Sequence, residues 1–160
     1  MVQRHTLAAL KRQPKRLRAV AFTSLRKRHL PRPFDKLGGP RLQHSGLIDV
    51  SETLAVLFLV RDGESPERRA FYGYLVQRTL DGLLPLVILH YHPSHKGVHI
   101  LVNCDTSQDY TSRQLPGAPE LALRTPDSID PGTQAGRLRL INLFCERCGV
   151  RIAPDDEQLI

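Results

Sequence analysis

The stretch LAVLFLV, Leu54–Val60, is the longest apolar run in the chain and decides how the fold is built around it. Successive side chains of a strand point to opposite faces of a sheet. Here both faces are apolar, one with Leu54, Val56, Phe58 and Val60 and the other with Ala55, Leu57 and Leu59. Such a strand is shielded from water only if both faces are covered. We therefore expect Leu54–Val60 to be a central strand.

Three further strands are expected after this one, over Ala70–Arg78, Leu86–His92 and Val98–Asn103. Turn residues such as Asp81-Gly82 separate them, and short strands joined by tight turns are typical of an antiparallel meander. The sequence thus predicts a four-stranded antiparallel meander.

A helix is expected over Thr133–Cys148, where apolar residues recur at helical spacing. Thr133 can cap its start and Gly149 its end. We expect this helix to cover one face of the meander, which makes the fold class α+β. The predicted α+β domain spans residues 47–154, and residues 155–160 form an acidic tail.

Residues 1–46 are expected to form a basic N-terminal arm and a linker rich in proline and glycine. Residues 1–48 contain twelve Lys and Arg and one acid, whereas residues 49–160 contain eleven Lys and Arg and fifteen acids. Within the arm, Lys15–Leu30 has apolar residues at helical spacing, so we expect a basic amphipathic helix there. A field of this sign attracts nucleic acid or an acidic protein partner, although a basic arm can also only solubilise a chain. The expected phosphate ligands of the arm are Lys15, Arg16, Arg18, Arg26, Lys27 and Arg28.

Composition favours a folded protein that does not enter a membrane. The chain has 160 residues, a formal net charge of +7 and 41% hydrophobic residues. Its longest apolar run is far shorter than the roughly 20 residues that a membrane helix needs. Three cysteines without a secretory pattern favour a reducing compartment, so we expect a cytoplasmic protein.

The hairpin ILHYHPSHKGVHILVN, residues 88–103, contains four of the seven histidines of the chain. Strand alternation places His90 and His92 on one face, and it places His99 and Asn103 on the same face if the apolar residues of both strands face the core together. His95 lies in the turn between the strands and is a candidate nucleic-acid ligand. The sequence therefore predicts one polar surface with several imidazoles.

Three kinds of chemistry fit this surface, and the residues do not decide between them. In metal-independent RNA cleavage, His90, His92 and His99 are acid/base candidates, and Lys96 would stabilise charge on the phosphorus-bound oxygens. In a zinc site the same three histidines would be ligands. In the third case, histidine, lysine and arginine bind phosphate on a polar sheet face without catalysis. A half-exposed strand also needs polar residues at alternate positions, for which histidine is acceptable.

The stretch HKGVHI, His95–Ile100, resembles the Lys-Gly-x-x-His neighbourhood of the TumE-like ribonuclease toxins of bacterial toxin–antitoxin pairs. The resemblance covers six residues, and Val98 stands near the place of an acid that is typical of that group. It implies a small curved sheet with helices and an active site that includes Lys96 and His99. A non-enzymatic accessory protein of a mobile element, which binds nucleic acid or protein, is the alternative.

Two further groups of residues are candidates for binding. Tyr110 and Arg113, in the long loop after the hairpin, can stack on a base and clamp a phosphate. Cys145 and Cys148 form a Cys-x-x-Cys pair, which is half of a zinc site or a redox pair. Because no second pair is present, and because Cys145 falls on the apolar stripe of its helix, packing in the core is the favoured interpretation.

Overall fold

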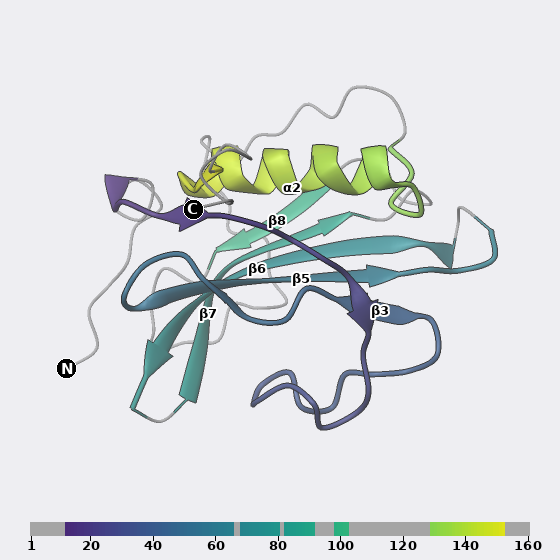
Figure 1. Ribbon diagram of the computed structural model, residues 1–160, viewed down its shortest axis with the longest axis horizontal. Helices are drawn as coiled ribbons and strands as arrows, with labels where there is room; N and C mark the ends of the chain where they lie inside the picture. The colour runs from purple at the N-terminus through teal and green to yellow at the C-terminus, as the bar shows by residue number, and fades with distance from the viewer. Residues whose placement is uncertain (1–11, 66–67, 81, 92–97, 103–128, 153–160) are drawn as a thin grey trace.

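The computed structural model describes residues 12–65, 68–80, 82–91, 98–102 and 129–152 (Figure 1). The fold is α+β, with a mostly antiparallel sheet and one helix near the C-terminus. The described elements are β1 (Arg16–Leu17), β2 (Thr23–Ser24), β3 (Leu42–His44), β4 (Ile48–Asp49), β5 (Leu54–Arg61), β6 (Ala70–Thr79), β7 (Gly82–Tyr91), β8 (Val98–Val102), α2 (Gln134–Cys148) and β9 (Arg151–Ile152).

The main sheet has seven strands, in the order β2-β3-β5-β6-β7-β8, with β4 also paired to β5. All of these pairs are antiparallel. The expected sheet of four strands was therefore too small, because β2, β3 and β4 extend it beyond β5. These three strands have only two or three residues each, too few to give a clear alternation in the sequence.

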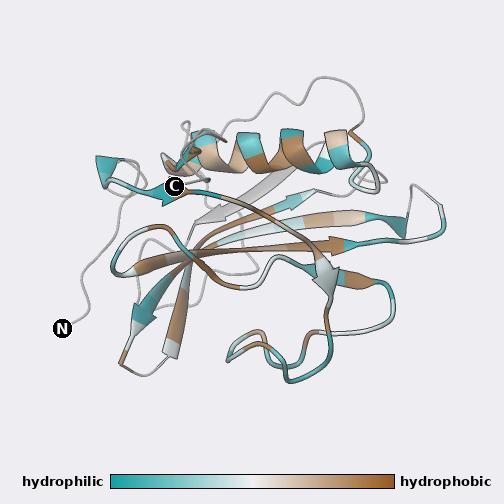
Figure 2. Cartoon of the chain, in the orientation of Figure 1, coloured by the Kyte–Doolittle hydropathy of each residue, from teal (hydrophilic) through white to brown (hydrophobic). Residues whose placement is uncertain are grey.

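The strand β5 is the centre of the fold, as expected. Seven of its eight residues are buried, and only Arg61 at its end is exposed. Figure 2 shows the hydrophobic stretch along β5 in brown. The side chains of β5 divide by strand alternation between two apolar clusters, one on each face of the sheet. Both faces are thus covered by other parts of the chain.

The helix α2 covers the first face and begins and ends as the sequence predicts. The Thr133 side chain accepts a hydrogen bond from the Gly136 N–H at 3.0 Å, which satisfies a free donor of the first turn. Gly149 adopts a left-handed conformation with φ of 69°, and it terminates the helix. Phe144 of α2 packs edge-on against Phe58 of β5, with ring centroids 5.2 Å apart. The helix lies close to β6 because Gly73 has no side chain, since a Cβ there would lie 2.8 Å from the Phe144 ring.

The chain between β2 and β3 covers the second face (Figure 1). Leu25, Leu30, Phe34 and Leu42 are buried there against the side of β5 that carries Ala55, Leu57 and Leu59. Residues 31–46, which were expected to be a linker, thus pack in part on the sheet.

The basic helix expected over Lys15–Leu30 is not present. Two short strands, β1 and β2, occupy part of this stretch, and β1 pairs in parallel with β9. Leu17 and Leu25 are buried in different clusters, on opposite faces of the sheet, so they cannot form the single apolar stripe of a helix.

No helix among the described residues is long and apolar enough to cross a membrane.

Two substitutions in α2 test how the helix is held on the sheet. Phe144 is 1% exposed and Leu138 is 56% exposed on the same helix. We expect Phe144→Ala to lower the free energy of unfolding by about 3–5 kcal/mol, since it leaves a cavity against Phe58. Urea denaturation followed by circular dichroism measures this loss. Leu138→Ala, the matched control, should change stability by less than about 0.5 kcal/mol, and equal effects of the two substitutions would contradict the packing of α2.

Candidate functional site

One row of residues crosses four strands of the sheet and forms the centre of the candidate site. The register places Leu59 of β5 opposite Tyr72 of β6, Tyr72 opposite His90 of β7, and His90 opposite His99 of β8. Directly opposite residues of antiparallel strands share a face. Arg61 is two residues beyond Leu59, so strand alternation places it on this face too.

His90 and His99 are therefore the two predicted site residues that the structure brings together. Their backbone positions are directly opposite each other in the register of β7 and β8. His92, His95, Lys96 and Asn103 lie outside the described residues, as do Tyr110 and Arg113.

The imidazole of His90 is half-buried between aromatic side chains. Its centroid is 4.9 Å from that of Tyr72 and 6.4 Å from that of Tyr74, and both contacts are edge-on. Burial, followed by the neighbouring Tyr72, raises the pKa of Tyr74 far above its usual value. The Tyr74 hydroxyl is therefore uncharged at physiological pH. Its ring packs against Phe34, which belongs to the segment between β2 and β3 that covers this face; we call it the covering segment.

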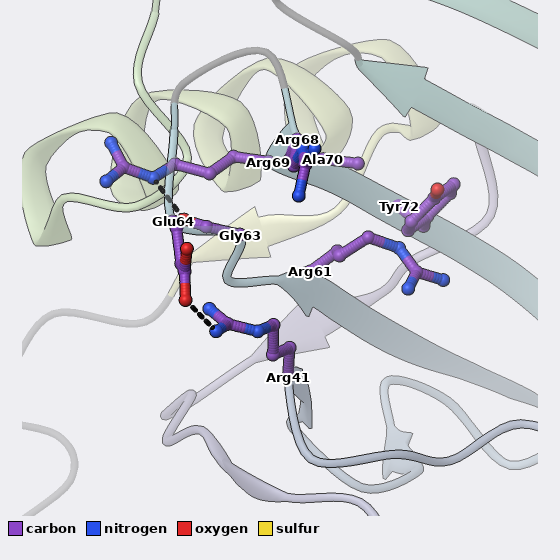
Figure 3. A pocket seen from close by; sticks show the side chains of 8 residues that line it. All are labelled: Arg41, Arg61, Gly63, Glu64, Arg68, Arg69, Ala70 and Tyr72. Atoms are coloured by element: carbon purple, nitrogen blue, oxygen red, sulfur yellow. Dashed lines mark hydrogen bonds and ion pairs between the residues drawn. The ribbon is translucent and has the colours of Figure 1, made fainter.

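A pocket of about 480 Å³ opens beside this row, at the end of β5. Its lining is rich in arginine and shares Tyr72 with the row (Figure 3). The lining residues are Arg41, Arg61, Gly63, Glu64, Arg68, Arg69, Ala70 and Tyr72. Four guanidinium groups and a single carboxylate thus surround one hollow, which favours an anion. We call it the arginine pocket.

Two of these arginines are held by other groups of the fold. The Arg41 guanidinium forms an ion pair with Glu64. Arg69 donates to the Gly63 carbonyl at 3.0 Å and to the Asp130 carboxylate at 2.8 Å. Arg69 thereby links the turn after β5 to the segment that precedes α2 through these two hydrogen bonds.

The other two, Arg61 and Arg68, are exposed and form no hydrogen bond or ion pair through their side chains with the part of the chain that the structure describes. Figure 3 shows the Arg61 side chain extended toward Tyr72. Each of the two guanidiniums thus has donors that a bound anion can use.

The arginine pocket was not predicted, because Arg61, Arg68 and Arg69 match no motif and Arg41 joins them only through strand pairing. Arg41 precedes β3, Arg61 ends β5, and Arg68 and Arg69 precede β6. The pairing of Leu42 with Arg61 in β3 and β5 brings these segments together. Only strand pairing across the sheet reveals the cluster, since no local spacing marks it.

The predicted phosphate ligands of the arm do not all reach the surface. Lys15 is 4% exposed, its Nζ donates to the Gln13 carbonyl at 2.8 Å, and burial lowers its pKa. Its ammonium group is therefore used inside the fold. The remaining members of the set are exposed, namely Arg16, Arg18, Arg26, Lys27 and Arg28. The last three lie in the segment that covers the second sheet face.

A second pair of histidines was not predicted from the sequence. His29 and His44 pack edge-on with ring centroids 5.2 Å apart. His44 is buried, and its Nδ1 accepts a hydrogen bond from the Gly46 N–H at 3.1 Å. Burial, followed by the neighbouring His29, lowers its pKa. This imidazole is neutral near pH 7 and stabilises the turn after β3.

Cys145 and Cys148 are free thiols buried at the C-terminal end of α2. Burial raises the pKa of Cys145 to about 12, so this thiol is protonated at neutral pH. A nucleophilic cysteine reacts as the thiolate, so this thiol is unreactive at neutral pH. Among the described residues no group of three or more His, Cys, Asp or Glu side chains is placed to hold a metal ion. The zinc alternative at His90, His92 and His99 includes a residue outside that range.

Comparisons of the chain with protein-family models, with curated proteins and with solved structures found no match.

The burial of Cys145 can be tested by alkylation. We expect iodoacetamide to leave Cys145 unmodified in the folded protein at pH 8 to 9, because the thiol is buried and protonated. Site-resolved mass spectrometry measures the modification. The same protein in denaturant is the control and should be fully labelled at Cys145. Rapid labelling in the folded state would contradict the buried, protonated thiol.

Proposed function

We propose that this protein binds RNA and cleaves it without a metal ion, with His90 and His99 as the acid/base pair. The observation that carries the proposal is the row across the sheet. The register aligns Tyr72, His90 and His99 across β6, β7 and β8, and the arginine pocket, which includes Arg61, shares Tyr72 with this row. Anion ligands and acid/base groups therefore occupy adjacent positions.

Binding is supported by the surface around the row. Arg61 and Arg68 can contact phosphate in the pocket, and Arg26, Lys27 and Arg28 are exposed on the covering segment nearby. This segment is fixed next to the pocket, because the Leu25 N–H donates to the Leu42 carbonyl at 2.9 Å. Contacts of this kind bind the nucleic acid backbone without reading its sequence.

Cleavage is supported by the chemistry of two neighbouring imidazoles. One takes the proton of an RNA 2′-hydroxyl, whose oxygen then attacks the adjacent phosphorus. The other gives a proton to the 5′-oxygen that leaves, so the products are a 2′,3′-cyclic phosphate and a 5′-hydroxyl. Histidine suits both roles because its ordinary pKa of about 6.5 lies near the working pH. The reaction uses the 2′-hydroxyl, so RNA and not DNA is the substrate.

The hairpin residues predicted from sequence complete this proposal. Lys96 would stabilise the charge that develops on the phosphorus-bound oxygens, and His92 is a further acid/base candidate. The resemblance to the TumE-like ribonuclease toxins assigns the active site to Lys96 and His99. A toxin that acts on cellular RNA would work in the cytoplasm, and the free thiols of Cys145 and Cys148 fit a reducing compartment.

Substitution of the paired histidines tests catalysis. We expect His90→Ala and His99→Ala each to lower the rate of cleavage of a fluorescently labelled RNA about 10²–10⁴-fold, because each removes a proton-transfer group. The assay contains a chelator. His29→Ala is the matched control, since His29 is an exposed histidine outside the row, and it should retain full activity.

Three results would count against the ribonuclease. RNA that stays intact with the unaltered protein would exclude cleavage, and loss of activity on chelation, together with zinc in the purified protein, would favour the zinc alternative. Binding without cleavage would favour the second candidate, a nucleic-acid-binding accessory protein of a mobile element. The exposed arginines of the pocket support that candidate, because they can bind anions without any contribution from the histidines. An acidic protein partner would use the same exposed arginines.

The salt dependence of RNA binding tests the covering segment. We expect the triple variant Arg26→Ala, Lys27→Ala, Arg28→Ala to reduce the slope of log K against log salt by about 2 for single-stranded RNA, because three phosphate contacts are lost. Fluorescence anisotropy at several salt concentrations measures the slope. Arg78→Ala is the control, since Arg78 pairs with Asp49 at the opposite end of β6. An unchanged slope in the triple variant would exclude the segment from the interface.

A further inference from the structure

Given the function proposed above, we propose that the arginine pocket is the binding site for a terminal phosphate monoester of the RNA. Its four guanidiniums come from Arg41, Arg61, Arg68 and Arg69. Nothing in the catalytic proposal requires such a concentration of positive charge.

The positive charge of the pocket matches a terminal phosphate of an RNA strand better than a phosphodiester within the strand. A phosphodiester carries a single negative charge, whereas a phosphate monoester carries about −1.5 to −2 at pH 7 and has three acceptor oxygens. Arg69 is already neutralised by Asp130, and Arg41 is paired with Glu64. Arg61 and Arg68 remain as two positive charges, which match one dianionic group.

Glu64 occupies a place that the phosphate can take. Its carboxylate binds Arg41 in the pocket, and the two side chains are 74% and 49% exposed. An ion pair this exposed is weak, because water screens both charges. A phosphate monoester carries more charge and more acceptor oxygens, so it can displace Glu64 and engage Arg41 together with Arg61. Glu64 is thus an internal competitor that the terminal phosphate has to displace from Arg41, so it lowers the affinity for the phosphorylated form.

The row gives the direction of the bound strand. Tyr72 of β6 is opposite both Leu59 of β5 and His90 of β7, and Arg61 lies two residues beyond Leu59 on β5. Two strand spacings are about 10 Å. A strand anchored by its terminal phosphate at Arg61 would therefore pass Tyr72 and reach His90 within its first few nucleotides. The proposed substrate class is RNA with a phosphorylated end, cleaved close to that end.

Binding is measured on oligonucleotides that cannot be cleaved. One short single-stranded sequence in 2′-O-methyl form is prepared with a 5′-phosphate, with a 3′-phosphate or with hydroxyls at both ends. We expect the full chain to bind one phosphorylated form about tenfold or more tightly than the hydroxyl form by fluorescence anisotropy. Arg61→Ala and Arg68→Ala should abolish this preference, and Glu64→Gln should enlarge it. Arg78→Ala, outside the pocket, should leave it unchanged.

Several outcomes would overturn the proposal. Equal affinity for all three ends would exclude a terminal phosphate site. A preference that survives Arg61→Ala and Arg68→Ala would place such a site elsewhere, and an unchanged or smaller preference in Glu64→Gln would reject the competitor role. Equally tight binding of a nucleoside monophosphate would show that the site takes a free phosphate monoester and not an RNA end. Exposure of both arginines lets the variants fold, and circular dichroism verifies this.

The two proposals fail in different ways. The 2′-O-methyl oligonucleotides lack the attacking hydroxyl, so their binding does not depend on cleavage. Loss of cleavage in His90→Ala with the end preference intact supports the pocket. End preference without any cleavage by the unaltered protein rejects the ribonuclease and keeps the terminal phosphate site.

Discussion

The burial of β5 on both faces is the constraint on which the rest of the structure depends. A strand with apolar side chains on both sides exposes one hydrophobic surface unless two separate layers cover it. The chain supplies these layers from its two ends. The helix α2 covers one face, and the segment between β2 and β3 covers the other. The N-terminal region is therefore a structural layer in addition to a source of positive charge.

The same arrangement determines where a ligand can bind. The covering segment packs over Ala55, Leu57 and Leu59 and contacts Tyr74 through Phe34. Arg61 is the one exposed residue of β5, at the end of the strand, and His90 is only half-buried. The polar residues of this face thus lie where the cover ends, and the turn after β5 adds the arginine pocket there.

The parts of the fold that could be predicted are those with a strong local pattern. Every residue of Leu54–Val60 is apolar, which predicts a strand buried on both faces. Thr133 and Gly149 are typical capping residues, which predict the two ends of α2. The prediction of a helix over Lys15–Leu30 was wrong, because Leu17 and Leu25 have helical spacing but pack on opposite faces of the sheet. Strand alternation predicts only that His90 and His99 share a face, whereas their directly opposite positions come from the register of β7 and β8. The arginine pocket could not be predicted, because the arginines around the turn after β5 match no motif and Arg41 reaches them only through the pairing of β3 with β5.

The ion pair between Arg69 and Asp130 joins two residues that are 61 positions apart in the chain. One belongs to the turn that forms the wall of the pocket, and the other precedes the helix layer. The wall therefore has its shape only when helix, sheet and turn are assembled together. An anion that requires this shape binds the folded chain and not the unfolded one, so its binding free energy adds to the stability of the whole domain. By linkage, occupancy of the pocket and folding of the chain are one coupled equilibrium.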